Sequence, residues 1–479
     1  MTVVGAGPNG LAAAVILARS GLQVEVHEAF GEPGGGARTT APDDSGFRYD
    51  ICSAVHPMAS ASPFFLAFDL AAHGVTLLQP EIAYAHPLDG GRAGLAWRNL
   101  DQTAADLGAD GAAWRALLGP LVDRWRQVTG VCMSDFRHPP PGLATAMLPL
   151  GRSFPQLASP LRRLRFHGDV APALLAGVCA HPVLPPDAIG AVGSGLLLAM
   201  LAHAVGWPVP AGGSQAITAA LADDLRAHGG RIVLGHQVTT LAELPRARAT
   251  VLNLSPAGVL AVTGRDLPAR YARQLRAYRY GGAASTVHFA LSEPVPWAAS
   301  GCGKAGTVHL AGSRAEVLAA EQAVRAGRPA DRPFVLAVQP GVADRGRAHV
   351  LSTYAHVPNG SGADVTEAVI AQVERFAPGF RDVVISHQTT PASRLPEHSA
   401  NYVGGDIAAG AMTTRQILFR PVARWDPYGT PLPGVYMCSA STPPGPGVHG
   451  MAGWHVARRI LRHRFGVRRP DIARILERT

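Results

Sequence analysis

The chain has 479 residues, of which 47% are hydrophobic and 16% charged, so it is long enough for two domains and too apolar to be largely disordered. Its formal net charge is +9, but the basic residues are scattered and accompany no nucleic-acid-binding motif, so we expect no nucleic-acid partner. The five cysteines are widely separated and no pair has a two-residue spacing, which argues against a redox dithiol or a zinc clip.

The first residues of the chain predict a strand, a glycine turn, a helix and a second strand. Thr2–Val4 is a short β-branched strand, and Gly5-Ala6-Gly7-Pro8-Asn9-Gly10 follows it directly. Leu11 to Ser20 is rich in Ala, Leu and Ile without a helix breaker, and Leu22 to Glu28 is the expected second parallel strand. This order is typical of a dinucleotide-binding βαβ unit.

Each glycine of the turn can be explained by a physical requirement of a dinucleotide-binding site. Gly5 allows the tight turn, Gly7 lets the backbone approach a pyrophosphate, and Gly10 permits close packing of the helix on the strand. The helix N-terminus, which includes Pro8 and Asn9, offers unpaired N–H groups to phosphate oxygens. Glu28 stands where a carboxylate is expected to hold the ribose hydroxyls. NAD and FAD both satisfy this pattern.

Four further segments indicate which cofactor is bound. They are Pro33-Gly34-Gly35-Gly36-Ala37-Arg38-Thr39, Tyr49 to Pro57, Asn401 to Ile407, and the glycine- and proline-rich run Gly434 to Met451. With these segments, essentially the whole chain resembles the phytoene desaturase and carotenoid isomerase branch of FAD enzymes, which is related more distantly to amine oxidases. The resemblance implies one non-covalently bound FAD.

The resemblance also implies residue roles. Gly35, Gly36 and Arg38 would bracket the pyrophosphate, with the guanidinium donating charge-assisted hydrogen bonds. Val238 would meet the adenine through its backbone. The last helix would start at Val448 to Met451, with its N–H groups facing the flavin's pyrimidine oxygen and stabilising charge on the reduced ring. The C-terminal residues expected at the cofactor are Ser441, Val448, Gly450 and Met451.

The fold class expected is α/β, with a Rossmann-like FAD-binding domain of the glutathione-reductase type and a discontinuous α+β substrate-binding domain. Pro210 to Ser214, a helix to about His228 and a strand Arg231 to Leu234 return the chain to the first domain. We therefore assign the FAD-binding domain to residues 1–72, 205–262 and 400–479, and the substrate-binding domain to 73–204 and 263–399. A further strand of the first domain is expected at Ala249 to Leu254.

The most apolar stretch, Ile189 to Trp207, contains His203 and four glycines, so a buried helix is expected rather than a membrane span. The dinucleotide motif begins close to Met1 and leaves no room for a leader peptide, so cytoplasmic residence is expected. Membrane contact is expected to be peripheral at most.

Residues for proton transfer are harder to identify. His449, His56 and Tyr402 are the catalytic candidates, because the resemblance places their segments near the flavin, although each histidine could equally be structural. Thr286 and His288 share one face of the strand Ser285 to Leu291, where many relatives carry a lysine, and we favour a core role for His288. Asn401 and Asp406 could orient a substrate or only satisfy the backbone. No metal-ligand cluster or catalytic triad order is evident, so no metal is expected.

The sequence therefore predicts an FAD-dependent oxidoreductase that dehydrogenates or oxidises a small, hydrophobic organic substrate by hydride transfer to flavin N5. The electron acceptor stays open among dioxygen, a quinone and another protein. Two alternatives remain, which are a redox-neutral FAD-dependent isomerase and a non-catalytic binding protein on the same fold.

Overall fold

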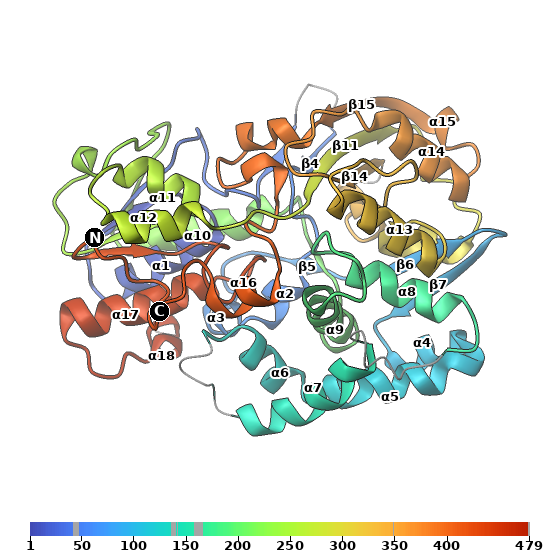
Figure 1. Ribbon diagram of the computed structural model, residues 1–479, viewed down its shortest axis with the longest axis horizontal. Coiled ribbons are helices and arrows are strands. Elements are labelled where there is room, and N and C mark those ends of the chain that lie inside the picture. The colour runs from blue at the N-terminus through green and yellow to red at the C-terminus, as the bar shows by residue number, and fades with distance from the viewer. Residues whose placement is uncertain (42–46, 136–139, 141, 158–165, 348, 478–479) are drawn as a thin grey trace.

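The computed structural model of the chain describes residues 1–479 except 42–46, 136–139, 141, 158–165, 348 and 478–479. Within the described residues, two larger sheets lie in different halves of the elongated molecule (Figure 1). The five-stranded sheet carries the glycine turn, and the seven-stranded sheet forms the opposite half. The expected α/β class is thus confirmed.

The five-stranded sheet is parallel throughout and has β1 at its centre. Its strands, in spatial order, are β16 (Val435–Met437), β10 (Thr250–Leu252), β1 (Thr2–Val4), β2 (Glu25–His27) and β9 (Arg231–Val233). Strands were expected at β1, β2, β9 and β10, but β2 is shorter than the predicted Leu22 to Glu28. Val3 lies opposite Val251 on one side and Val26 on the other. These three valines are fully buried, as expected of a sheet covered on both faces.

Helix α1 (Pro8–Arg19) is buried from Asn9 to Ala18 because its Ala, Leu and Ile side chains have apolar neighbours all round. The helices that accompany this sheet are α10 (Gln215–Ala227), α11 (Pro256–Thr263), α12 (Ala269–Arg276), α17 (Met451–Phe465) and α18 (Ile472–Leu476). The prediction that the helix starting near Met451 is the last one is wrong, because α18 follows it. Two short helices, α2 (Pro57–Ala61) and α3 (Pro63–Phe68), connect this half to the other.

The seven-stranded sheet is mixed, with only β12 and β6 parallel. Its strands, in spatial order, are β15 (Val384–Thr390), β11 (Ala283–Leu291), β14 (Val350–Val357), β13 (Val335–Val338), β12 (Ala305–Leu310), β6 (Ile82–Leu88) and β7 (Arg92–Trp97). Strand β11 is buried along its whole length, and one of its faces joins an apolar core that includes Val287 and Phe289. Its other face lines a pocket.

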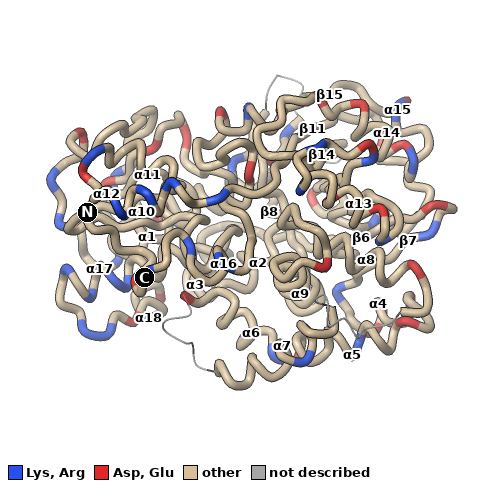
Figure 2. Tube along the Cα trace, in the orientation of Figure 1, with Lys and Arg blue, Asp and Glu red and all other residues tan. Residues whose placement is uncertain are grey.

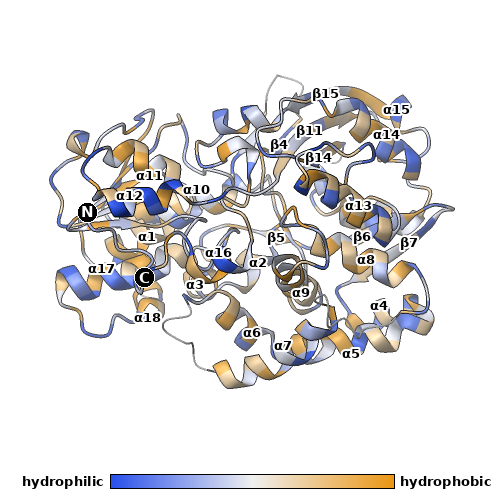
Figure 3. Cartoon of the chain, in the orientation of Figure 1, coloured by the Kyte–Doolittle hydropathy of each residue, from blue (hydrophilic) through white to orange (hydrophobic). Residues whose placement is uncertain are grey.

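The remaining helices either contact the second sheet or pack on helices that do. They are α4 (Leu100–Asp106), α5 (Gly111–Val122), α6 (Trp125–Cys132), α7 (Leu143–Leu157), α8 (Val170–Cys179), α9 (Ile189–Ala204), α13 (Arg314–Arg325), α14 (Thr366–Phe376), α15 (Phe380–Val383) and α16 (Thr414–Phe419). The expected buried helix is α9, which packs into an apolar cluster with Trp114 and Trp207 and is coloured as largely hydrophobic in Figure 3. None of the described helices is both long and apolar enough to cross a membrane.

All strands of the parallel sheet come from residues 1–72, 205–262 and 400–479, and all strands of the mixed sheet from 73–204 and 263–399. The exact domain boundaries stay a prediction. Two small sheets complete the fold, β3 (Thr39–Thr40) with β4 (Tyr49–Asp50) and β5 (Leu77–Leu78) with β8 (Val209–Pro210). Figure 2 shows basic and acidic residues interspersed along the chain, with basic residues gathered along α17 and just after it.

Candidate active site

The glycine turn between β1 and α1 is closely packed. Gly5 has φ of +96°, in the region that favours glycine, and a Cβ on Gly10 would lie 2.2 Å from the carbonyl oxygen of Gly5. Gly7 precedes the first helical residue in an extended conformation, and no side chain caps the helix there. The start of α1 is therefore bare backbone, which is the arrangement that favours an anion.

Two buried polar side chains flank this turn. Glu28 follows β2 and accepts hydrogen bonds from the backbone N–H groups of Ala6, at 2.7 Å, and Phe30, at 3.1 Å. Asn9, in the first turn of α1, is 6% exposed, and its Oδ1 atom has no hydrogen-bond partner. Because a buried acceptor without a partner is costly, Asn9 Oδ1 fits a hydrogen-bond donor lying against the helix start.

The loop after Glu28 lies against the same turn. A Cβ on Gly35 would be 3.1 Å from the Cα of Gly7, so the two glycines let these loops touch. The Arg38 guanidinium donates from Nε to the carbonyl of Gly35 at 3.1 Å, donates to the carbonyl of His398, and stacks 4.3 Å over the Phe30 ring. Arg38 thus lies beside the turn, and some of the N–H groups of its guanidinium already donate hydrogen bonds to backbone carbonyl oxygens.

Tyr402 reaches this loop from the distant segment that also contains Asn401. A Cβ on Gly36 would lie 1.7 Å from the Tyr402 hydroxyl oxygen, so only glycine leaves room for the phenol. Burial raises the pKa of Tyr402 well above its usual range and raises the pKa of the neighbouring Cys52 thiol to about 11. Both groups are therefore neutral hydrogen-bonding groups at physiological pH.

The C-terminal loop is held by its own polar groups. His449 is fully buried, and its Nδ1 accepts a hydrogen bond from the backbone N–H of Met451 at 3.0 Å. Its Nε2 is 3.1 Å from the carbonyl oxygen of Gly445, which can only accept, so Nε2 carries the proton. Both ring nitrogens are therefore used to hold the start of α17. Ser441 is likewise engaged, donating its hydroxyl to the carbonyl of Ala409 at 2.7 Å.

The remaining predicted residues have identifiable local partners. Val238, after β9, is buried in an apolar cluster that also contains Val4. Asn401 accepts from the backbone N–H of Ser255 at 2.7 Å and donates to the carbonyl of Asn253 at 3.1 Å. Asp406 accepts backbone N–H groups, including that of Gly281 at 2.7 Å. Asn401 and Asp406 therefore satisfy backbone groups, which is the second of the two roles considered for them.

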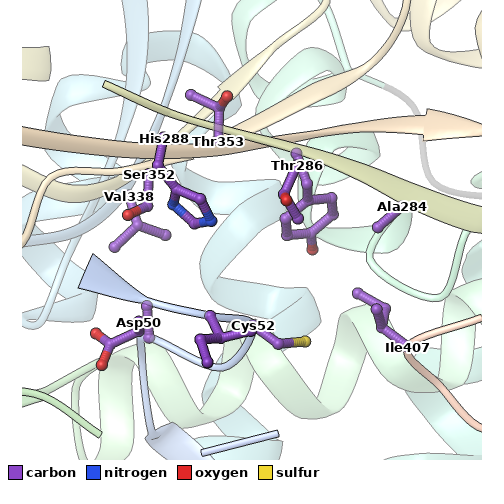
Figure 4. A pocket seen from close by; sticks show the side chains of 12 residues that line it. Asp50, Cys52, Ala284, Thr286, His288, Val338, Ser352, Thr353 and Ile407 are labelled. Carbon is purple, nitrogen blue, oxygen red and sulfur yellow. The ribbon is translucent and has the colours of Figure 1, made fainter. Parts of the chain in front are cut away.

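A first pocket, here called the sheet pocket, lies between β11 and β14 on one side and the segment Asp50–Cys52 on the other (Figure 4). It encloses about 20 Å³. Thr286 is paired with Tyr354, and His288 with Ser352, across the two antiparallel strands, so all four side chains stand on the pocket face. The prediction that Thr286 and His288 share a face is confirmed.

His288 is stacked on the Tyr49 ring with centroids 4.2 Å apart, and burial lowers its pKa to about 4. Asp50 turns its carboxylate away from this pocket in Figure 4. One oxygen accepts from Thr39 and from the backbone N–H of Ser214, and the other pairs with Arg347 at 2.7 Å. The sheet pocket thus contains polar side chains within a largely apolar lining and presents no free carboxylate.

A second pocket, here called the histidine pocket, encloses about 110 Å³. It brings together segments far apart in the sequence, and its lining residues are Ser53, Val55, His56, Pro57, Met58, His181, Leu198, Trp207, Gly447 and Val448. Two of these, His56 and Val448, were predicted from the sequence to lie near the flavin. His181 and Trp207 were missed, because no motif marks either residue.

The tautomer of His56 follows from its neighbours. The single hydroxyl proton of Ser214 is donated to the carbonyl of Ser53 at 2.5 Å. His56 Nε2, which is 2.7 Å from that hydroxyl oxygen, must therefore be the donor between them. Its Nδ1 consequently bears a lone pair, and this atom is buried without a partner. Burial lowers the pKa of His56 to about 4, so the ring is neutral.

His181 lines the same pocket and continues into a buried group of histidines. Its Nε2 is 2.9 Å from Nε2 of His309, and burial lowers the pKa of His181 to about 3. In the part of the chain that the structure describes, no three His, Cys, Asp or Glu side chains are grouped to hold a metal ion. All five cysteines are unpaired.

Comparisons with known proteins agree with this geometry. Residues 3–69 match the family model described as an NAD(P)-binding Rossmann-like domain. The chain is 25% identical over 565 aligned residues, covering 96% of it, to pyridine nucleotide-disulfide oxidoreductase domain-containing protein 2 of Rattus norvegicus, of which 93% is covered. It is 28% identical to an uncharacterized protein of Mycobacterium tuberculosis (strain ATCC 25618 / H37Rv), over 56% of each chain.

Solved structures share the fold at low sequence identity. Putrescine oxidase bound to putrescine has 17% identity and a TM-score of 0.58, with 96% of this chain and 98% of that chain covered. Cyclohexylamine oxidase from Brevibacterium oxydans IH-35A has 17% identity and a TM-score of 0.54, covering 100% and 99%. An oxidoreductase from Methanosarcina mazei has 16% identity and a TM-score of 0.59, covering 95% and 99%. The chain therefore carries a Rossmann-like dinucleotide-binding domain within an oxidoreductase fold, and the predicted enzyme class, oxidoreductase, is confirmed at this level.

Proposed function

We propose that this protein binds FAD non-covalently and oxidises a small, largely apolar organic substrate. The observation that carries the proposal is the bare start of α1, where glycines leave the backbone uncovered and no side chain caps the helix. The oxygens of a dinucleotide pyrophosphate accept the hydrogen bonds that the free backbone N–H groups of this helix start donate. FAD is favoured over NAD by the loop and C-terminal segments that resemble those of FAD enzymes, and by the fold shared with two amine oxidases.

The residues proposed to hold the cofactor lie in four segments. The turn from Gly5 to Gly10 would receive the pyrophosphate, with Gly35, Gly36 and Arg38 on its other side. Glu28 and Val238 would bind the adenosine end, and Ser441 with Val448 to Met451 the flavin end. When bound, the flavin supplies a hydride acceptor at its N5 atom.

His56 is the side chain best placed to bind the reacting end of a substrate. The ring lines a mostly apolar pocket that also contains Val448, and its Nδ1 is buried without a hydrogen-bond partner. His449 is assigned a positioning role, because both of its nitrogens hold α17. The polar face of β11 and β14 would line the neighbouring sheet pocket, and Tyr402 would lie beside it, against Cys52. The electron acceptor would be dioxygen, a quinone or another protein.

The cofactor is tested on the purified protein. We expect a bound flavin, visible by its absorbance and released intact on denaturation, which shows that it is non-covalent. Glu28→Gln is expected to weaken FAD binding by about tenfold, since it removes a charge from a buried acceptor of two N–H groups. Glu25→Gln, on the strand β2 that precedes Glu28, is the matched control and should bind FAD like the wild type. A colourless protein that cannot be reconstituted would refute the proposal and favour a binding protein.

The reaction is tested by mixing the flavin-loaded protein with candidate substrates in the absence of oxygen. An oxidase or dehydrogenase loses its flavin absorbance stoichiometrically with its substrate. An isomerase that uses reduced flavin converts its substrate without net loss. Product formation without bleaching would therefore replace the oxidation proposal with the redox-neutral one.

A further inference from the structure

We infer that the sheet pocket is the binding site of a single buried water molecule, held by the hydroxyl groups of Thr286, Ser352 and Tyr354. This inference goes beyond the proposed function, because none of the residues that line the sheet pocket is among those proposed to hold the cofactor. It concerns a site built from this chain's own side chains, and its test does not depend on the reaction.

The first step concerns hydrogen bonds. Thr286, Ser352 and Tyr354 stand on one face of the antiparallel pair β11 and β14 and line the pocket. Thr286 and Ser352 are only 5% and 8% exposed. None of the three hydroxyl groups forms a hydrogen bond with another described residue, whereas the hydroxyl of Thr353 donates to the carbonyl of Val287 at 2.7 Å. Because buried hydroxyl groups without partners are costly, a polar ligand is expected beside them.

The second step concerns direction. Figure 4 shows the Thr286 hydroxyl and the His288 ring directed from β11 toward the segment that contains Cys52. The two side chains therefore project into the space that the pocket occupies. Burial lowers the pKa of His288 to about 4, so its ring is neutral and offers one donor and one acceptor.

The third step concerns charge and size. Asp50 is the only Asp, Glu, Lys or Arg that lines the pocket, and its carboxylate pairs with Arg347 at 2.7 Å and turns away. An ion would therefore find no counter-charge there. The volume of about 20 Å³ exceeds the roughly 10–15 Å³ that one water needs and is too small for an organic molecule. The three hydroxyl groups match the about three hydrogen bonds that a buried water usually makes.

The position of the site gives the water a structural role. β11 and β14 belong to the mixed sheet, whereas residues 50–52 belong to the half of the molecule that carries the glycine turn. Next to the pocket, the Ile51 N–H donates to the carbonyl of Arg38 and the Ser53 N–H to the carbonyl of Gly36, both at 3.0 Å. The water site thus lies between the mixed sheet and the segment that supports the loop proposed to bind pyrophosphate.

The first test is a crystal structure of the protein as purified, with the flavin that it carries. We expect one water peak within about 3.0 Å of at least two of the three hydroxyl oxygens. A second crystal is pressurised with xenon, which enters dry apolar cavities and is not expected in this pocket. Xenon density in the pocket, or a pocket without water density, would overturn the inference.

Matched substitutions test the site in solution. Thr286→Val and Tyr354→Phe each remove a hydroxyl group of the pocket. Their controls, Thr307→Val and Tyr84→Phe, remove buried hydroxyl groups that also lack a partner but line neither pocket. Because a bound water loses a hydrogen bond only in the pocket variants, we expect their melting temperatures to fall by about 1–2 °C and those of the controls to stay unchanged or rise. A pocket variant that melts no lower than its control would contradict the inference.

Discussion

Gly453 allows helix α17 to lie directly on the first turn of α1, and replacing it with alanine tests how the fold supports the cofactor site. A Cβ at this position would lie 2.3 Å from the carbonyl oxygen of Asn9 and 2.6 Å from the amide nitrogen of Ala13. Both are backbone atoms of a buried helix, so no side-chain rotation relieves the overlap. The helices must separate, and the strain falls on the turn proposed to bind pyrophosphate.

The expected magnitude follows from two opposing effects. Overpacking of a core costs about 1–3 kcal/mol, and the contact with two backbone atoms places Gly453→Ala at the upper end. Alanine gains back about 1 kcal/mol over glycine inside a helix. We therefore expect Gly453→Ala to lower the free energy of unfolding by about 2 kcal/mol and to lose part of its FAD.

Gly151→Ala is the matched control, because Gly151 also lies inside a helix, α7, but a Cβ there would meet nothing within 4 Å. This variant gains the helix propensity without the overlap, so it should be neutral or more stable by up to about 1 kcal/mol, with full flavin content. Urea denaturation followed by tryptophan fluorescence, together with flavin content after gel filtration, measures both effects. If Gly453→Ala is as stable as Gly151→Ala and retains its FAD, the tight α1–α17 contact does not support the site.

Three further predictions use buried groups. Asp50→Ala removes one of the two carboxylates that pair with buried Arg347 and leaves Asp344 as the other, so the free energy of unfolding should fall by about 1.5–3 kcal/mol, and the double variant Asp50→Ala with Arg347→Met should recover part of this loss in denaturant titrations. His449→Ala removes the acceptor for the Met451 N–H and should cost about 0.5–2 kcal/mol in the same assay. Burial lowers the pKa of His56, His86 and other histidines from 6.5 to about 4, so the unfolded chain takes up protons at a higher pH than the folded chain does. The free energy of unfolding should therefore be at its full value above pH 6.5 and should decline as the pH falls towards 4. A denaturation midpoint that does not fall over this interval would contradict this prediction.

The sequence predicted the parts of the fold that depend on local patterns. The strand Thr2–Val4, the glycine turn and the start of α1 were located because glycine spacing and apolar runs have a direct structural meaning. The return of the chain at α10 and β9 was located for the same reason. The length of β2 and the presence of α18 were missed, since both depend on tertiary pairing and not on local preference.

The site was predicted less completely, because its residues meet only in three dimensions. His56 and Val448 were expected near the cofactor, but nothing in the sequence indicated that His181, at the end of α8, would share a pocket with them. The register that pairs Thr286 with Tyr354 across β11 and β14 was equally inaccessible, although the alternation along β11 correctly placed Thr286 and His288 on one face.

The comparison between His56 and His449 shows why hydrogen-bond partners, and not residue type, decide which histidine can act. The two were indistinguishable in the sequence, and both are buried and neutral in the structure. The ring of His449 accepts a hydrogen bond from the Met451 N–H and donates one to the carbonyl oxygen of Gly445, so neither ring nitrogen is free for a ligand. His56 meets a hydroxyl that has already donated its proton, which fixes the imidazole proton on Nε2 and leaves the buried Nδ1 without a partner. The two histidines therefore differ in one atom, because only His56 keeps a buried acceptor that no group of the described chain satisfies.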